Sequence, residues 1–386
     1  MQITKRVQEI QPSGIRLFFD LVLGMKDVIS LGVGEPDFVT PWNIREQAIY
    51  SLEKGYTSYT SNKGIEELRR QIAVFLKNKY GLRYDAEEEI LITVGVSEGM
   101  DLAVRALFSG GDKVMVPEPT YVSYWPIAYL TGASPYYVST RPDDGFKLTP
   151  ELFLRKIKKG TRFLMLNYPG NPTGASYSKE ELRELCRLTI KHDLVVLSDE
   201  IYDDLTYESK HTPLAAFKGM RERTIYLNGF SKSYAMTGFR IGYVCAPKAA
   251  VAAMTKIHQY TMMCVPITSQ MAALEALKNG FSAVMEMKKE YRRRRDFIVA
   301  GLNKLGLSCH KPQGAFYVFP SIKGTGYSSL DFSKALLHSQ KVAVVPGTAF
   351  GPSGEGYVRM AYAASMDNLK EALIRIGDFL GTDRHG

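Results

Sequence analysis

The sequence predicts an α/β protein built around a mostly parallel β-sheet. Three observations support this prediction. The middle of the chain alternates short apolar runs, rich in β-branched residues, with amphipathic helical segments, which is the pattern of β-α-β crossovers. The last quarter changes to an α+β pattern. The 386 residues are 45% hydrophobic and 23% charged, a globular composition at a length that supports a large core.

The predicted strands are short apolar runs, each followed by small or polar residues. The first, at residues 90–94 (ILITV), is followed after Gly95 by a helix that reaches residue 108. Later strands are predicted at residues 113–116, 163–167, 194–198, 224–228 and 241–245. Ser178 and Glu181 form an S-x-x-E capping box that opens a helix ending near residue 193. Strands and helices therefore alternate through this part of the chain.

The last quarter of the chain predicts a second domain. A long charged helix at about residues 285–305 precedes strands within residues 314–320, 341–347 and 356–363, and a final helix begins near Ser365. The first 44 residues lie outside the alternating pattern and are assigned to the same domain. We therefore predict a large α/β domain at residues 45–285 and a smaller α+β domain at residues 1–44 plus 286–386.

The composition of the chain argues against several classes of binding partner. Lys and Arg exceed Asp and Glu by 49 − 40 = 9, but basic residues are spread along the chain, so we predict no nucleic-acid site. The cluster at residues 292–295 (RRRR) has acidic neighbours, which predicts a solvated helix face. The four cysteines form no CxxC pair, so neither a metal site nor a disulfide framework is predicted. The polar N-terminus and the absence of a long uncharged apolar run predict a cytoplasmic protein without a membrane span.

Polar, small or aromatic residues follow the predicted strand ends. In parallel α/β sheets, ligands bind at the carboxyl ends of the strands. The residues at these positions are Val96, Ser97, Tyr121, Asn171, Asp199, Tyr202, Lys232 and Arg240. We therefore expect them to form one binding site.

The side chains at these positions suit different atoms of one aromatic ligand. Asp199 closes an apolar strand, where a buried acid needs a partner such as a protonated ring nitrogen. Asn171 and Tyr202 can donate hydrogen bonds to a phenolate oxygen on the same ring, and Tyr121 offers a face for stacking.

The remaining groups suit a phosphate and an aldehyde. Ser97 begins a helix, whose free backbone N–H groups favour a phosphate, and Arg240 adds a planar guanidinium fork. Lys232 can condense with an aldehyde. Pyridoxal 5′-phosphate combines a basic ring nitrogen, a phenolate, a phosphate and an aldehyde, so we predict it as the cofactor.

Each of these residues alone has a structural interpretation. A single loop lysine such as Lys232 is usually solvated. Ser97 alone reads as a helix cap, Asn171 in NPTG as a turn and Tyr121 as packing. The functional interpretation depends on their occurring together, each at a strand end.

Six motifs resemble the class I and II aminotransferases of fold type I. They are LGVGEPDF (residues 31–38), YTSNKGIEELR (59–69), NYPGNPTG (167–174), SDEIY (198–202), SKSYAMTGFRIG (231–242) and YVRMAYA (357–363). The resemblance covers essentially the full chain and is strongest to the prokaryotic aspartate and aromatic aminotransferases. It implies a mostly parallel seven-stranded sheet in the large domain.

The resemblance also implies roles for the site residues. Lys232 is implied as the lysine that forms the Schiff base and moves protons, with Asp199 as partner of the ring nitrogen. The other cofactor contacts implied are Val96, Ser97, Tyr121, Asn171, Tyr202, Ser231 and Arg240. Val96 departs from the small residue often found at its position, but a backbone contact there tolerates any side chain.

Substrate binding and assembly are implied by the resemblance alone. Arg359 matches the arginine that binds the substrate α-carboxylate, with Gly34 and Asn171 beside it. Tyr59 matches a tyrosine that reaches the phosphate of the neighbouring subunit, which implies a homodimer with shared active sites.

The implied activity is ping-pong transamination between an L-amino acid, aspartate or aromatic, and a 2-oxo acid such as 2-oxoglutarate. Alternatives with the same cofactor are a carbon–sulfur lyase or an alanine or diaminopimelate-pathway aminotransferase, because fold does not fix chemistry. Similar domains also serve as effector-binding modules of transcription regulators. LGVGEPDF begins at Leu31, which leaves no room before it for a DNA-binding module.

The substrate side chain remains open at this stage. A dicarboxylic substrate needs a second cation, and Arg105, Lys63 and Arg16 are candidates. Aromatic residues near the motifs suit aromatic substrates or core packing equally: Phe18, Phe19, Tyr56, Tyr124 and Trp125. By resemblance, Ile15 and its neighbours form a mobile entrance segment.

Overall fold

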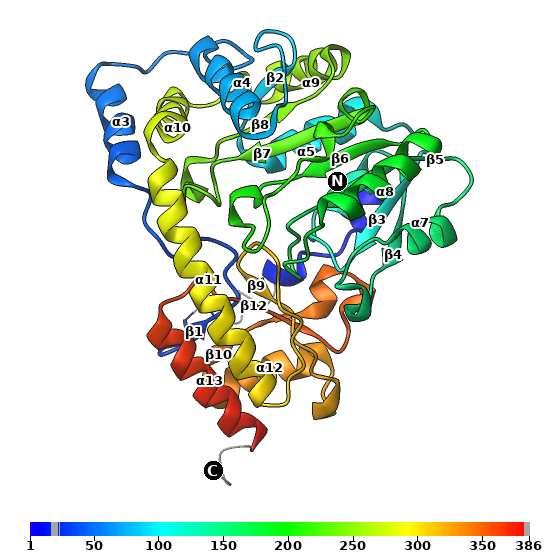
Figure 1. Ribbon diagram of the computed structural model, residues 1–386, viewed down its shortest axis with the longest axis vertical. Helices are drawn as coiled ribbons and strands as arrows, with labels where there is room; N and C mark the ends of the chain where they lie inside the picture. The colour runs from blue at the N-terminus through cyan, green and yellow to red at the C-terminus, as the bar shows by residue number, and fades with distance from the viewer. Residues whose placement is uncertain (17–21, 23, 382–386) are drawn as a thin grey trace.

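A seven-stranded sheet forms the centre of the larger part of the protein, the upper part in Figure 1. The computed structural model describes residues 1–16, 22 and 24–381. The sheet has the order β2-β8-β7-β6-β5-β3-β4. Its strands are β2 (Ile90–Thr93), β3 (Lys113–Glu118), β4 (Ser134–Ser139), β5 (Thr161–Asn167), β6 (Val195–Asp199), β7 (Thr224–Gly229) and β8 (Gly242–Cys245). The predicted α/β class and mostly parallel sheet are confirmed.

One strand of this sheet, β8, runs opposite to all the others. Strands β4, β3, β5, β6 and β7 pair in parallel, whereas β8 is antiparallel to both β7 and β2. The sequence prediction missed β4. This strand lies at the sheet edge and contains Pro135, a residue that edge strands tolerate and that weakens the sequence signal of a strand.

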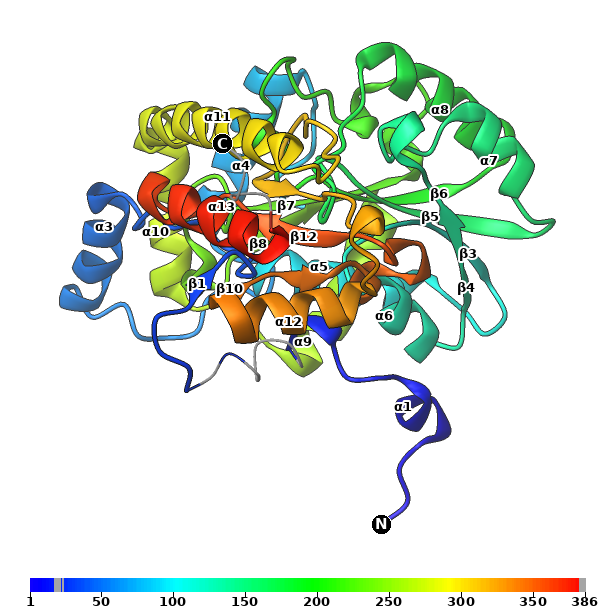
Figure 2. The same cartoon turned by 90° about the horizontal axis from the view of Figure 1, so that it is seen from below.

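Helices cover both faces of the sheet (Figure 2). Val114 and Val116 pack on one side with α5, α6 and α9, whereas Met115 between them packs on the other side with α7 and α8. Side chains alternate across a strand, so burial on both faces explains the continuous apolar runs. The helices of this part are α3 (Trp42–Glu53), α4 (Glu66–Tyr80), α5 (Gly95–Leu107), α6 (Tyr124–Leu130), α7 (Pro150–Lys156), α8 (Lys179–Lys191), α9 (Lys248–Thr261) and α10 (Ile267–Asn279). Helix α8 begins with the predicted capping box.

The C-terminal part contains two small sheets with helices against them (Figure 1). Strands β11 (Val345–Pro346), β12 (Val358–Ala361) and β9 (Tyr317–Val318) form an antiparallel sheet, and β1 (Ile29–Ser30) pairs with β10 (Val342–Ala343). Further helices are α1 (Lys5–Glu9), α11 (Phe281–Lys304), α12 (Ser329–Gln340) and α13 (Met366–Leu380). The pairing of β1 with β10 joins the N-terminal segment to this part. The domain boundaries themselves stay a prediction.

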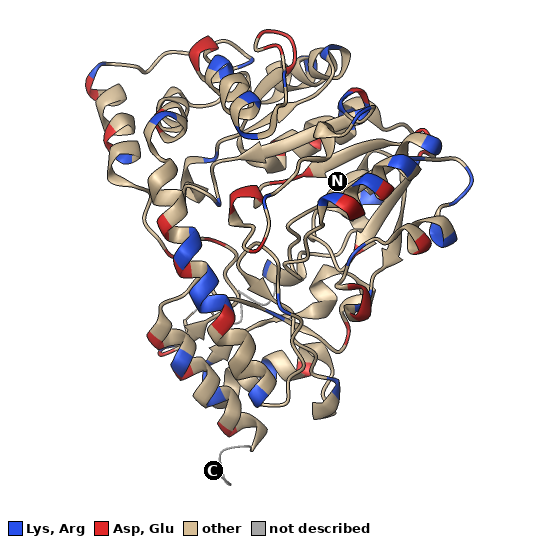
Figure 3. Cartoon of the chain, in the orientation of Figure 1, with Lys and Arg blue, Asp and Glu red and all other residues tan. Residues whose placement is uncertain are grey.

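The arginine cluster of α11 corrects the sequence interpretation. Arg292 and Arg293 are exposed, but Arg294 and Arg295 are buried. Arg294 pairs with Asp37 at 2.8 Å, and Arg295 pairs with Glu208 at 2.6 Å. Figure 3 shows blue and red segments interspersed along this helix. The predicted solvated face is therefore wrong for half of the cluster, because acidic residues from distant segments pair with these two arginines in addition to their neighbours on the helix.

None of the helices in the described ranges is long and apolar enough to cross a membrane.

Candidate active site

One cavity of about 740 Å³ gathers nearly all the predicted site residues. It lies where the carboxyl ends of the central strands face β9 and β12. The predicted residues that line it are Gly34, Val96, Ser97, Tyr121, Asn171, Asp199, Tyr202, Ser231, Lys232, Arg240 and Arg359. Tyr59 does not line it; its side chain is 82% exposed.

Lys232 projects into this cavity from the loop after β7. Its Nζ donates a hydrogen bond to the carbonyl oxygen of Gly34 at 2.6 Å. Burial, together with the positive charge of Arg359, lowers the pKa of Lys232 to about 8. A larger fraction of its amine is therefore unprotonated near neutral pH than for an ordinary lysine, as a nucleophile requires.

Asp199 is a buried carboxylate at the end of β6. Its Oδ2 accepts a hydrogen bond from Tyr124 at 2.6 Å, and its Oδ1 accepts one from the backbone N–H of Ile201 at 3.2 Å. Burial raises the pKa of Asp199 to about 6. An acid held here in its ionised form would attract a cationic partner in the cavity.

A cradle for an anion lies between β2 and β8. Helix α5 begins at Gly95, which has a φ of +73°, and a Cβ there would lie 2.8 Å from Nη2 of Arg240. Glycine therefore permits the close approach of this guanidinium to the helix start. Ser97 lies in the first turn, and Ser231 also lines the cavity. Helix N–H groups and a guanidinium together suit a phosphate.

The opposite wall of the cavity contains a second arginine. Arg359 on β12 is 1% exposed, and its Nη1 donates to Oδ1 of Asn171 at 3.0 Å. Its Nη2 donates to the carbonyl of Gly32, and its buried Nε has no hydrogen-bond partner within the described residues. Donors therefore remain on the guanidinium for a carboxylate.

Sequence reasoning missed several cavity residues. Tyr317 on β9 shares a hydrogen bond with Tyr202, with the hydroxyl oxygens 2.9 Å apart, and donates to the carbonyl of Gly34 at 3.3 Å. Asn167 accepts a hydrogen bond from the backbone N–H of Asn171 at 2.8 Å. Asn167 ends β5, so the strand-end argument could have found it. Tyr317 lies on β9 in the three-stranded antiparallel sheet, and its sequence position gives no such signal.

The structure also shows which of the candidate cations for a second substrate carboxylate line the cavity. Arg105 pairs with Asp101 on the exposed side of α5, and Lys63 donates to the backbone carbonyl of Glu87; neither lines the cavity. Arg16 does line it, as does Ile15. Among the aromatic candidates, Tyr124 lines the cavity, Trp125 lines an adjoining groove and Tyr56 is exposed. Phe18 and Phe19 lie outside the described residues.

The sequence matches the family described as aminotransferase class I and II over residues 26–376. The chain belongs to this family. It is 54% identical to YugH of Bacillus subtilis, a candidate aminotransferase, with 97% of each chain covered. It is 44% identical to an aspartate aminotransferase of Pyrococcus abyssi, again with 97% of each covered. The solved structure of an aromatic aminotransferase from Pyrococcus horikoshii is 43% identical, with a TM-score of 0.90 over 95% of this chain and 98% of that one.

These relatives confirm that the chain is an aminotransferase of fold type I, as the motifs predicted. Their names differ in the amino acid, because aspartate and aromatic aminotransferases occur at nearly equal identity. The family thus identifies the reaction class of this aminotransferase without identifying its donor. The cavity lining contains one lysine, Lys232, one buried carboxylate, Asp199, and the arginines Arg16, Arg240 and Arg359.

Proposed function

We propose that this aminotransferase uses pyridoxal 5′-phosphate held covalently by Lys232, and that it transfers amino groups from aspartate or an aromatic amino acid to a 2-oxo acid such as 2-oxoglutarate. The observation that carries the proposal is a half-buried lysine with a pKa lowered to about 8 in a cavity that also contains Asp199, Arg240 and Arg359. When bound, the cofactor supplies an aldehyde for the amino group and a ring that accepts electron density from the substrate carbon.

The chain's own groups fit each part of this cofactor. The start of α5, Ser231 and Arg240 would bind the phosphate through N–H, hydroxyl and guanidinium donors. Asp199 would bind the protonated ring nitrogen, and Tyr121 would stack on the ring. Asn171 and Tyr202 would donate to the phenolate oxygen. Gly95 supports the fit, since any side chain there would enter the space of Arg240.

Arg359 would bind the substrate, and Lys232 would transfer its proton. The free N–H groups of Arg359 bind the α-carboxylate and so orient the amino acid, with Gly34 and Asn171 beside it. Once the substrate amino group has displaced it from the cofactor, Lys232 Nζ would be free to take the proton from the substrate α-carbon and to pass it to the cofactor carbon that carried the aldehyde. Its lowered pKa suits this role, because a general base works best when its pKa lies near the working pH. The same amine returns the proton in the reverse half of the ping-pong cycle.

The proposal includes a cytoplasmic homodimer in which Tyr59 reaches the partner's phosphate site. Tyr59 is 82% exposed, and Val39, Trp42 and Leu52 on the same part of the chain are also exposed. These exposed apolar residues support an interface at this part of the chain. Sedimentation should give a dimer, and a monomer at micromolar concentration with full activity would contradict it.

Arg16 is our candidate for the distal carboxylate of a dicarboxylic substrate. It lines the cavity, and no hydrogen bond or ion pair joins it to another described residue. An Arg16→Met variant should raise the KM for 2-oxoglutarate and leave the KM for pyruvate nearly unchanged. Arg105→Met, which removes an arginine outside the cavity, is the matched control. Equal KM changes for both acceptors would refute this assignment.

A donor screen tests the reaction itself. The chain is incubated with the cofactor, 2-oxoglutarate and aspartate, tyrosine, phenylalanine, alanine or lysine, and glutamate formation is measured. We expect equal amounts of glutamate and the new 2-oxo acid. A 2-oxo acid without glutamate would instead indicate a lyase and would refute transamination.

A further inference from the structure

Tyr124 lines the cavity but has no role in the function proposed above. It begins α6, its side chain is 2% exposed, and its hydroxyl donates to Oδ2 of Asp199 at 2.6 Å. Its ring packs edge-to-face against Tyr121, with centroids 5.7 Å apart. Tyr124 therefore contacts both the residue proposed to stack on the ring and the residue proposed to bind its nitrogen.

The Asp199 carboxylate depends on few donors. Besides Tyr124, the only hydrogen-bond donor to its side chain among the described residues is the backbone N–H of Ile201. Burial favours the protonated acid, while the hydrogen bond from Tyr124 favours the carboxylate. The other charged groups facing it are Glu200, which disfavours the carboxylate, and Lys232, which favours it. Loss of one donor would therefore shift the balance toward the neutral acid.

Toward the ionised carboxylate of Asp199, the hydroxyl of Tyr124 is the donor. Burial and the charge of Asp199 raise the pKa of its phenol well above the ordinary value, so the hydroxyl keeps its proton. We propose that Tyr124 is a positioning residue: it keeps the Asp199 carboxylate ionised and oriented toward the cofactor's ring nitrogen. This inference rests on the proposed function, because it needs the cofactor in the cavity.

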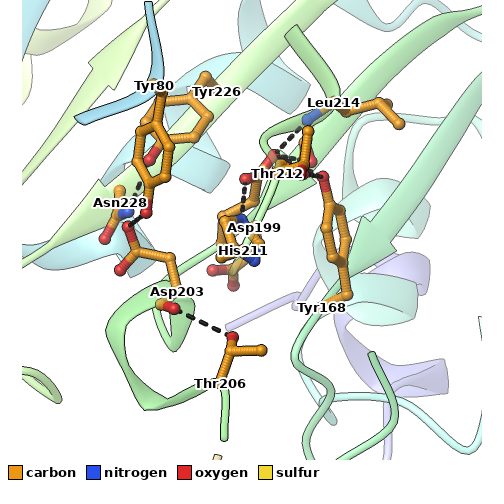
Figure 4. A network of polar contacts seen from close by, with 12 residues as sticks. Tyr80, Tyr168, Asp199, Asp203, Thr206, His211, Thr212, Leu214, Tyr226 and Asn228 are labelled. Carbon is orange, nitrogen blue, oxygen red and sulfur yellow. Dashed lines mark hydrogen bonds and ion pairs between the residues drawn. The ribbon is translucent and has the colours of Figure 1, made fainter. Parts of the chain in front are cut away.

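A neighbouring tyrosine supplies a matched control. Tyr168 is also fully buried and donates to a carboxylate at the end of β6, that of Glu200, at 3.1 Å. Figure 4 shows Tyr168 and His211 in the polar network beside Asp199. Glu200 also pairs with His211 and does not line the cavity. Tyr168→Phe thus removes a similar hydrogen bond that is not directed at the cofactor.

The experiment compares cofactor binding by Tyr124→Phe, Tyr168→Phe and the wild type. Each chain is stripped of cofactor and titrated with pyridoxal 5′-phosphate while protein fluorescence is followed, from pH 5 to pH 9. For Tyr124→Phe we expect about a tenfold to hundredfold weaker affinity, the loss of a hydrogen bond to a charged acceptor. The pH below which binding weakens should also rise, because Asp199 would take up its proton at higher pH. Tyr168→Phe should change neither the cofactor affinity nor the pH below which binding weakens.

The outcomes separate this inference from the proposed function. Wild-type chain that binds no cofactor at Lys232 overturns both. Wild-type binding with an unchanged Tyr124→Phe variant overturns the role of Tyr124 alone, as does an equal change in Tyr168→Phe. If Tyr124→Phe unfolds, a ring-fluorinated tyrosine at position 124 keeps the packing and is a stronger donor. It should move the acid limit of binding downward, and an unmoved limit would refute the proposal.

Discussion

Replacing Arg359 tests how the cavity recognises the substrate carboxylate. The guanidinium already donates to Asn171 and to the carbonyl of Gly32, which leaves the Nε–H and one N–H on each terminal nitrogen. The substrate therefore gains a charge-assisted pair with a guanidinium that is 1% exposed. Removing one partner of such a pair costs about 2–5 kcal/mol. At 1.36 kcal/mol per tenfold, Arg359→Met should lower kcat/KM for amino acids by roughly 30-fold to several thousandfold.

An amine without a carboxylate separates recognition from general damage. The half-reaction is followed by the absorption of the enzyme-bound cofactor, with tyrosine and its decarboxylated analogue tyramine as donors. Wild type should prefer tyrosine over tyramine by roughly 30-fold to several thousandfold, and Arg359→Met should lose this preference. Its reaction with tyramine should fall far less than its reaction with tyrosine, because only the pKa of Lys232 changes for tyramine. Arg105→Met should retain the preference. A variant that still discriminates between the two amines as strongly as wild type would refute the assignment of Arg359.

Three further predictions follow from the pKa of Lys232, the buried arginine of α11 and the helix start at Gly95. The folded-state pKa of Lys232, about 8, lies below the ordinary 10.5, so the amine deprotonates as pH rises through 8. The rate of cofactor attachment should reach half its maximum near pH 8; a midpoint near 10 would contradict this. Arg295→Met should lower the free energy of unfolding in urea by about 2 kcal/mol, because its side chain is fully buried and its acidic partners are half-exposed, whereas exposed Arg292→Met should change it by less than about 0.5 kcal/mol. Equal effects would show that the buried pairs do not stabilise the fold. Gly95→Ala should weaken cofactor affinity about tenfold in a fluorescence titration, since its Cβ would enter the guanidinium facing it; Gly81→Ala, with a φ of +72° but open space around it, controls for backbone strain and should leave affinity unchanged.

Much of the candidate site could be predicted because the residues that we propose bind the cofactor are encoded locally. Asp199 ends a strand, Lys232 follows the next one, and each strand-to-helix turn places its polar residue at the same edge of the sheet. The alternating pattern therefore predicts both the sheet and the edge at which a ligand binds. Periodicity and strand ends are properties of short segments, so one sequence is enough to detect them.

The parts that sequence reasoning missed depend on distant segments. The burial of Arg294 follows from Asp37, which lies 257 residues away in the chain. The hydrogen bond from Tyr124 to Asp199 spans 75 residues, and that between Tyr202 and Tyr317 spans 115. A tyrosine destined for such a pair looks like any core tyrosine in the sequence. Tertiary packing determines which tyrosine hydroxyl donates a hydrogen bond to a carboxylate.

The placement of the two arginines explains how one cavity can serve two substrates in turn. Arg240 lies at the sheet edge beside α5, whereas Arg359 lies on β12 in the antiparallel sheet. The proposed phosphate site and the proposed carboxylate site are therefore built by different sheets. A ping-pong reaction needs the cofactor to stay while the first product leaves and a second acid enters. Separate anchors meet this need, because release of a carboxylate from Arg359 would leave the proposed phosphate contacts of Arg240 intact.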